Sequence, residues 1–183
     1  DLIYAVDHAR TDPRIQVLVL DLERLRGGGI CKLQDIGAAL KRFRESGKSI
    51  VAHGEVFTQQ QYYLAAHANH LYLHPMGSIF LTGYGAYRNY YKTALDKLMI
   101  RMHVFIVGTF KSALEPFLRD DMSLPAKAAN QAWLDDLWHA YRADLAGLRP
   151  LTAEGIDMYI DQFSALLAET EGDSARLALT QGL

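Results

Sequence analysis

The sequence has only one cysteine, Cys31, among its 183 residues. A lone cysteine cannot close an intrachain disulfide, so neither a disulfide framework nor a cysteine-based zinc site is expected. No apolar run approaches the roughly 18 residues that a membrane span needs, and no signal peptide is visible. Because the chain opens at Asp1 inside a helical pattern and without methionine, we expect a piece of a longer protein, whose anchor this sequence would not show.

Neither sign of charge is in large excess: 19 basic residues stand against 21 acidic ones, and the net charge is -2. Proteins that bind nucleic acid usually carry a basic excess, so this balance argues against nucleic acid as a partner. Half of the residues are hydrophobic and 22% are charged, which is typical of a globular protein. The length suffices for one domain with a substantial core.

The hydrophobic pattern alternates between strand and helix signals and then becomes helical. We predict strands at 15–20, 49–53, 71–73 and 102–107, an extended segment at 78–86, and loops at 21–30 and 54–58, with a turn at 74–77. Helices are predicted at 1–10, 33–46, 59–68, 89–99, 125–148, 151–167 and 174–181. The first strand, helix and second strand form a unit in which parallel pairing is the default. The sequence therefore predicts a single α/β domain over residues 1–183, with a mostly parallel sheet flanked by helices and a helical C-terminal part.

A lysine follows the last predicted strand, where the apolar run 104–107 ends in Gly108-Thr109-Phe110-Lys111. Open α/β folds place ligands and chemistry at the ends of buried strands. A lysine there can be partly desolvated, and a neutral lysine amine can act as a general base. Ser112 could cap a short helix running toward Pro116. The alternative is that Lys111 is an ordinary solvated surface lysine.

Two other stretches have features of a catalytic site. Consecutive glycines, Gly27-Gly28-Gly29, let backbone N–H groups approach a ligand closely, as an oxyanion hole requires; the alternative is a flexible surface loop. The stretch Thr58-Gln59-Gln60-Gln61 lies at a loop-to-helix junction, where acyl-transfer enzymes often place a nucleophile. Glutamine cannot serve as one, and neither Ser78 nor Ser112 has an evident partner base. These residues alone do not name a reaction.

Metal binding is not expected from the histidines. Seven histidines are scattered along the chain, and His67 and His70 are three residues apart. No carboxylate or third ligand follows at a spacing that would complete a site. The long helix at 125–148 carries an aromatic and leucine stripe at Trp133, Leu137, Trp138, Tyr141 and Leu145. A stripe of that width is typical of a core or an interface rather than of a ligand site.

The sequence resembles the signal peptide peptidase A family (protease IV), specifically the amino-terminal half of its long two-half form. The likeness runs over essentially all 183 residues. Its strongest blocks are Asp12-Pro13-Arg14-Ile15 with 17–22, Gln61-Tyr62-Tyr63-Leu64-Ala65, Tyr90-Tyr91-Lys92 and the continuous block 108–123.

The resemblance implies a serine–lysine peptidase with a crotonase-like, Clp-protease-like α/β fold. The family's lysine base lies in a Gly-Thr-(aromatic)-Lys-Ser motif, which corresponds to Lys111. The family's serine nucleophile precedes Gly-Gly-Tyr-Tyr, so Gln59 stands where that serine would be. The working serine is then expected from a carboxy-terminal half, and Arg26-Gly27-Gly28-Gly29 matches the family's oxyanion loop only loosely. No metal or organic cofactor is implied.

The resemblance also implies partners and a location. The substrates are cleaved signal peptides or other unfolded peptides, held extended along strand edges. The partners are the carboxy-terminal half and further copies in a homo-oligomeric ring, expected to be a tetramer, with the stripe of residues 133–145 as a contact. The protein is expected at the bacterial inner membrane, facing the periplasm. Two alternatives stay open: an acyl-CoA enzyme of the crotonase fold, and a non-catalytic half that serves as an assembly scaffold.

Overall fold

The computed structural model describes residues 2–105, 107–108 and 111–183. These residues fall into two compact units. The first unit contains the residues up to Gly83 together with Ala140–Leu183, and the second contains the described part of Tyr84–His139. The single domain over residues 1–183 stays a prediction. None of the helices within the described ranges has both the length and the apolar content that a membrane span needs.

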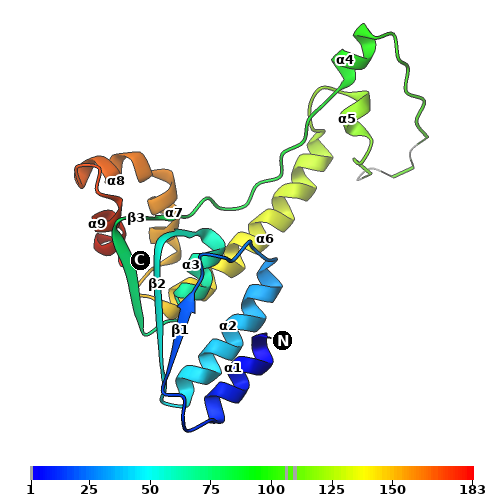
Figure 1. The fold of residues 1–183 in the computed structure, drawn as a ribbon. Coiled ribbons are helices and arrows are strands. Elements are labelled where there is room, and N and C mark those ends of the chain that lie inside the picture. Colours follow the sequence, from blue (N-terminus) through cyan, green and yellow to red (C-terminus); the bar gives the residue numbers. More distant parts are fainter. Residues whose placement is uncertain (1, 106, 109–110) are drawn as a thin grey trace. The chain divides into compact units, whose positions relative to one another are not determined.

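The first unit is built on a parallel sheet whose described strands run in the order β1-β2-β3 (Figure 1). The strands are β1 Val17–Asp21, β2 Ser49–Thr58 and β3 His70–Phe80. This confirms the predicted strands at 15–20, 49–53 and 71–73 and their parallel pairing. The mixed α/β class is therefore correct, with a small parallel sheet and many helices.

The second and third strands are longer than predicted. Residues 54–58 continue β2 and residues 74–77 lie inside β3, so the predicted loop and turn are wrong. The predicted loop and turn were placed at Gly54 and Gly77, because glycine usually interrupts a strand. Gly54 begins a shift in register between β2 and β3, and a side-chain carbon on Gly77 would lie 2.2 Å from the carbonyl oxygen of Glu55. These glycines permit an irregularity within the pair of strands rather than ending it.

The helices of the first unit cover one face of the sheet. In chain order they are α1 Leu2–Thr11, α2 Ile30–Glu45, α3 Gln59–Ala65, α7 Ala153–Asp161, α8 Phe163–Glu169 and α9 Ser174–Thr180, and α6 Leu124–Leu148 contributes its last residues. Helix α1 packs on α2, α2 and α3 pack on β2, and α9 packs on β3. The predicted helix at 151–167 is divided into α7 and α8 at Gln162. The core includes Phe43, Ile50, Phe57, Tyr62 and Tyr141, each almost fully buried.

The other face of the sheet, which we call the open face, carries exposed side chains and is not covered by the described helices of the first unit. Val17 and Val19 of β1 are 49% and 57% exposed, and Tyr72 of β3 is 61% exposed. The register places Val19 beside Val51 and His53 beside Tyr72, so these side chains share one face. Parallel sheets are usually covered on both faces. The open face therefore lacks the cover that such sheets normally have.

The second unit contains α4 Lys92–Lys97, α5 Glu115–Leu118 and the first part of α6. The strand predicted at 102–107 is wrong for residues 102–105 and 107, which form no strand, and residue 106 lies outside the described residues. Helix α5 begins after Leu114 without a side-chain cap, so Ser112 does not cap it. Within the stripe of α6, Tyr141 and Leu145 are fully buried, whereas Trp133 is 46% exposed.

Candidate active site

The glycine loop after β1 and the start of α3 are brought together in the first unit. The backbone N–H of Gly28 donates a hydrogen bond to Oε1 of Gln60 at 3.2 Å. Gly27 has φ +113°, a conformation that favours glycine, and a side-chain carbon there would lie 2.3 Å from the same oxygen. The two stretches that the sequence singled out separately are thus neighbours at the carboxyl edge of the sheet.

Gln59, at the expected position of the nucleophile, is 8% exposed and has a structural role. Its Oε1 accepts hydrogen bonds from the backbone N–H groups of Thr82 at 2.9 Å and Gly83 at 2.8 Å. Its Nε2 donates to the carbonyl oxygen of Gly83 at 3.2 Å. The amide therefore ties the start of α3 to the segment after β3, and it supplies no nucleophile.

Gln61 completes this set of ties. With Thr58 it forms a capping box at the start of α3, and its Nε2 donates to the carbonyl oxygen of Leu22 at 2.8 Å. The hydroxyl of Thr58 is occupied by this cap. Sequence reasoning missed the role of the glutamines, although the Thr-x-x-Gln spacing is a readable capping signal.

Neither candidate serine belongs to this junction. Ser78 lies inside β3, paired with Val56, and is 9% exposed. Ser112 belongs to the second unit. Among the described residues, no lysine or histidine forms a hydrogen bond with either hydroxyl. Neither serine is therefore a candidate nucleophile in this chain.

Lys111 lies in the second unit and is exposed. No hydrogen bond or ion pair joins its amine to the residues that the structure describes. Its neighbours Thr109 and Phe110 lie outside those residues, so the motif is described only at Gly108 and from Lys111 onward. Gly108 has φ +111° and lies against the Lys111 stem. The role of Lys111 as a general base stays a prediction.

Two blocks of the family pattern meet in the second unit. The backbone N–H of Tyr91 donates to the carbonyl oxygen of Pro116 at 2.7 Å, and that of Thr93 donates to the Asp120 carboxylate at 2.9 Å. The Tyr91 ring stacks on Phe117 with centroids 6.1 Å apart. The segment that follows Lys111 is thus held against the segment that begins α4.

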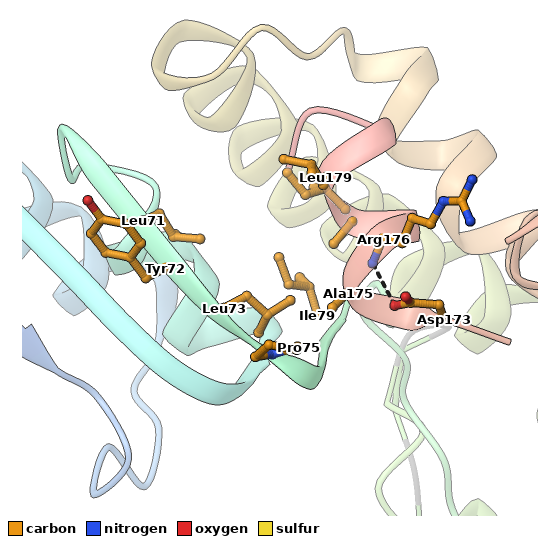
Figure 2. Close-up of a pocket in the computed structure, with 11 residues that line it drawn as sticks. Leu71, Tyr72, Leu73, Pro75, Ile79, Asp173, Ala175, Arg176 and Leu179 are labelled. Atoms are coloured by element: carbon orange, nitrogen blue, oxygen red, sulfur yellow. Dashed lines mark hydrogen bonds between the residues drawn. The ribbon is translucent and has the colours of Figure 1, made fainter.

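A groove of about 460 Å³ lies between β3 and α9 in the first unit (Figure 2). It is lined mostly by apolar side chains, among them Leu71, Leu73, Ile79 and Leu179. Asp173, at its rim, is occupied in capping α9 through the backbone N–H of Arg176. The lining contains no serine, histidine or lysine, so the groove offers apolar contact rather than acid–base chemistry.

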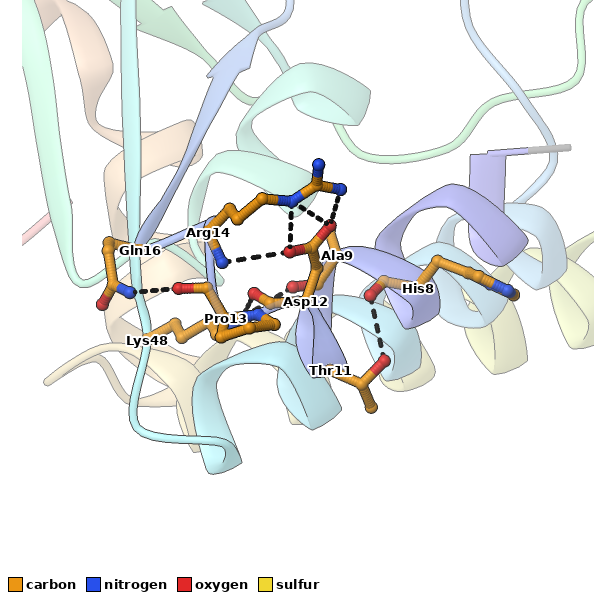
Figure 3. Close-up of polar contacts among 8 residues, drawn as sticks. All are labelled: His8, Ala9, Thr11, Asp12, Pro13, Arg14, Gln16 and Lys48. Carbon is orange, nitrogen blue, oxygen red and sulfur yellow. Dashed lines mark hydrogen bonds and ion pairs between the residues drawn. The ribbon is translucent and has the colours of Figure 1, made fainter.

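Asp12-Pro13-Arg14, another block of the family pattern, forms the turn from α1 into β1 (Figure 3). The Arg14 backbone N–H and guanidinium both donate to the Asp12 carboxylate, and this side-chain hydrogen bond lowers the pKa of Asp12. Lys48 Nζ donates to the carbonyl oxygens of Ala9 at 2.7 Å and Asp12 at 2.6 Å. These carbonyl groups lie at the C-terminal end of α1, where a positive charge stabilises a helix. The block is therefore structural.

We expect Lys48→Met to destabilise the chain by about 2 kcal/mol, because it removes charge-assisted hydrogen bonds from two carbonyls while keeping most of the apolar stem. Urea unfolding measures the free energy of unfolding. Lys41→Met is the matched control, since Lys41 is exposed and no hydrogen bond joins its amine to the described residues. Equal stability of the two variants would show that the Lys48 contacts contribute nothing.

Comparison with known proteins gives the family. The model of peptidase family S49 matches residues 42–183. Two bacterial proteins called Protease 4 are similar over all 183 residues, at 39% identity in Haemophilus influenzae and 40% in Salmonella typhi. The serine protease SPPA of Arabidopsis thaliana chloroplasts is 25% identical over 154 residues, which cover 84% of this chain and 23% of that protein. This chain spans 30% of the length of each Protease 4 relative. The chain belongs to peptidase family S49.

Proposed function

We propose that this chain is the lysine-bearing part of the amino-terminal half of a serine peptidase and that Lys111 is its general base. The serine nucleophile is supplied by a carboxy-terminal half. Two observations together support the proposal: the lysine is exposed, and the position expected for the nucleophile holds a glutamine whose side chain is already hydrogen-bonded. Lys111 is exposed without a partner among the described residues, whereas Gln59 is buried and bonded to the segment after β3.

The reaction follows from these roles. Lys111, in its neutral form, takes the proton from the serine hydroxyl as the oxygen attacks the peptide carbonyl carbon. The carbon–nitrogen bond breaks, protonated Lys111 gives that proton to the leaving amine and becomes neutral again, and an acyl-enzyme remains. Lys111 then takes a proton from water as the water attacks the ester, and it returns this proton to the serine oxygen as the acid leaves. Lys111 is needed in both steps, so its loss stops the whole cycle.

Exposed apolar side chains support a partner half. In the second unit Phe105 is 99% exposed and Val107 is 84% exposed. In the first unit the open sheet face presents Val17, Val19 and Tyr72. Contiguous exposed apolar surface marks interaction sites. We propose that the carboxy-terminal half and further copies of the chain cover these surfaces in a homo-oligomeric ring.

The finer features of the proposal rest on the family resemblance. The substrates are cleaved signal peptides and other unfolded peptides, and the assembled protein is a ring of four copies at the bacterial inner membrane, facing the periplasm. The fold of the complete half is crotonase-like and Clp-protease-like, which agrees with the parallel sheet and its flanking helices. An assembly scaffold without a catalytic lysine is the second candidate, which the open sheet face alone would also support.

We expect hydrolysis of an apolar fluorogenic peptide only when this chain is mixed with the carboxy-terminal half of the same protein. In the proposed mechanism this chain supplies only the base, and the other half supplies only the nucleophile. The initial rate is measured for each half and for the mixture, with size-exclusion chromatography confirming that the halves have associated. Robust hydrolysis by this chain alone would contradict the proposal, and an inactive associated mixture would also contradict it.

A further inference from the structure

A cavity of about 430 Å³ opens at the surface of the first unit, and α2, α3 and α6 all contribute to its lining. None of its lining residues takes part in the proposed reaction. Four of them are small, Gly37 and Ala38 of α2 and Ala143 and Gly147 of α6. Because these residues have short side chains, the helices leave room for a small ligand between them.

His67 lines this cavity with a ring that has no polar partner within the chain. The residue is 6% exposed, and neither Nδ1 nor Nε2 forms a hydrogen bond with the described residues. The ring packs against α2 at Gly37, where a side-chain carbon would lie 2.5 Å from Nε2, and its edge meets the ring of Tyr63 with centroids 5.7 Å apart. Buried polar groups are nearly always hydrogen-bonded, so an unpaired ring indicates a partner that comes from outside the chain.

The charged groups around the ring are mostly cations. Lys41 and Arg44 of α2 line the cavity, and Arg149 acts on the ring as a third positive charge. The Asp144 carboxylate of α6 also lines the cavity, but its Oδ2 already accepts two hydrogen bonds from within the chain. Among the described residues, three cations and one carboxylate therefore act on His67, which leaves an excess of two positive charges.

Lys41 and Arg44 are placed to bind an anion. They are three positions apart on α2, so their side chains leave the helix on the same side. Lys41 is exposed, and Arg44 donates one hydrogen bond, from Nη1 to the carbonyl oxygen of His67 at 3.1 Å, which leaves further N–H groups for a ligand. Lysine and arginine form strong, charge-assisted hydrogen bonds to oxyanions. We propose that this cavity binds a phosphate-type oxyanion with two negative charges, held by Lys41 and Arg44 and paired with the ring of His67.

Such an anion supplies the counter-charge that His67 lacks. Burial lowers the pKa of His67 to about 4. A negative charge close to the ring favours the imidazolium form and raises this pKa, typically by about one to three units. Anion binding and proton uptake by His67 then strengthen each other. The affinity for the anion should therefore rise as the pH falls from 7.5 to 5.5.

The inference goes beyond the proposed function, because it needs neither Lys111 nor a serine and concerns the first unit alone. A failure of the mixing experiment would leave it standing, and a failure here would leave the role of Lys111 standing.

The test titrates the 183-residue chain with sodium sulfate, whose dianion does not change its charge between pH 5.5 and pH 7.5. The backbone amide signal of Gly37 is followed by nuclear magnetic resonance, and sodium chloride keeps the ionic strength constant. We expect a saturable shift whose dissociation constant is roughly threefold lower at pH 5.5 than at pH 7.5. In His67→Gln the constant should be the same at both pH values, because glutamine does not titrate. Sodium acetate, with a single charge, should bind more weakly than sulfate at pH 7.5.

Two lysine variants locate the binding site. Lys41→Met should weaken sulfate binding roughly tenfold, the equivalent of one charge-assisted hydrogen bond. Lys32→Met is the matched control, since Lys32 is exposed on the same helix but does not line the cavity, and its affinity should be unchanged. If Lys41→Met does not give the dispersed spectrum of a folded chain, Lys41→Gln replaces it.

A Gly37 shift that is linear in sulfate and equal in all the proteins would overturn the proposal, and so would equal affinity in the two lysine variants. An affinity of the unmodified chain that does not change with pH would contradict the pairing with His67. Acetate binding as tight as sulfate binding would contradict the assignment of a dianion.

Discussion

Lys111→Ala is expected to lower kcat/KM by roughly a thousandfold in the assembled halves, with their association unchanged. General-base catalysis by a positioned side chain contributes about 10²–10⁴-fold to a rate. In the proposed reaction the same amine serves both acylation and deacylation, so we expect no second group to take its place. Lys111 is exposed in this chain, and no hydrogen bond joins its amine to the described residues. Lys111→Ala should therefore change the free energy of unfolding only slightly.

Two further variants separate base catalysis from charge. Lys111→Arg keeps a positive charge, but a guanidinium does not lose its proton in proteins, so this variant should be as inactive as Lys111→Ala. Lys127→Ala, at an exposed position of α6, should keep full activity. The rates are measured with the apolar fluorogenic peptide at saturating partner half. Activity of Lys111→Ala within twofold of the unmodified chain would leave this half a scaffold.

Acidification is expected to cost the chain up to about 3 kcal/mol of stability through His67 between pH 6.5 and pH 4. His67 is 6% exposed, and neither ring nitrogen has a partner among the described residues. Burial lowers its pKa to about 4, with a further contribution from the nearby Arg44. The unfolded chain takes up the proton near pH 6.5 and the folded chain does so only near pH 4. The stability is therefore complete above pH 6.5 and is lost as the pH falls toward 4.

The surroundings of His67 favour its neutral form. A surface cavity of about 430 Å³ is lined by His67, by Lys41 and Arg44 of α2, and by Asp144 of α6. Arg149 is a third cation near the ring, and among the described residues the Asp144 carboxylate acts in the opposite direction. The Asp144 carboxylate is already bonded to the hydroxyl of Tyr63 at 2.7 Å and to Gln34 at 3.0 Å. It is therefore a poor partner for a protonated His67.

His67→Gln tests this account, because glutamine is polar and does not titrate. The free energy of unfolding is measured by urea at several pH values from 7.5 to about 4. The variant should lose less stability than the unmodified chain between pH 6.5 and pH 4, whatever its stability at pH 7.5. The carboxylates with lowered pKa, such as Asp7 and Glu115, titrate in both proteins and cancel in the comparison. If the free energy of unfolding fell equally with pH in both proteins, His67 would not be the cause of the loss of stability.

The sheet of the first unit could be predicted because β1 and the first parts of β2 and β3 are runs rich in aliphatic residues, although β2 and β3 continue beyond the breaks that the sequence indicated. Strand composition also predicted a strand at 102–107, and there the prediction was wrong. A strand needs a neighbouring strand, and the described sheet ends at β1 and β3. Phe105 and Val107 are almost fully exposed. Composition shows that a segment can pair, whereas pairing also needs a neighbouring strand, which residues 102–105 and 107 do not have among the described residues.

The candidate site was predicted in its parts but not in its contacts. The glycine loop and the start of α3 could each be singled out by local chemistry. The hydrogen bond between Gly28 and Gln60 joins residues 32 positions apart, and it depends on the parallel pairing of β1 and β2. The capping box of Thr58 and Gln61 is local and could have been read from its spacing. The isolation of His67 follows from packing, which a sequence of scattered histidines does not reveal.

The most direct test of the central claim is chemical rescue at Lys111. The chain carries Lys111→Cys together with Cys31→Ser, because Cys31 is exposed and would also react. The assembled halves are assayed before and after aminoethylation of the introduced thiol, which rebuilds an amine of nearly the length of lysine. If Lys111 is the base, activity is absent before the treatment and returns after it. The rise of kcat/KM with pH should then move to lower pH, because sulfur withdraws electrons from the new amine. Activity that is present before aminoethylation, or absent after complete modification, would contradict the account.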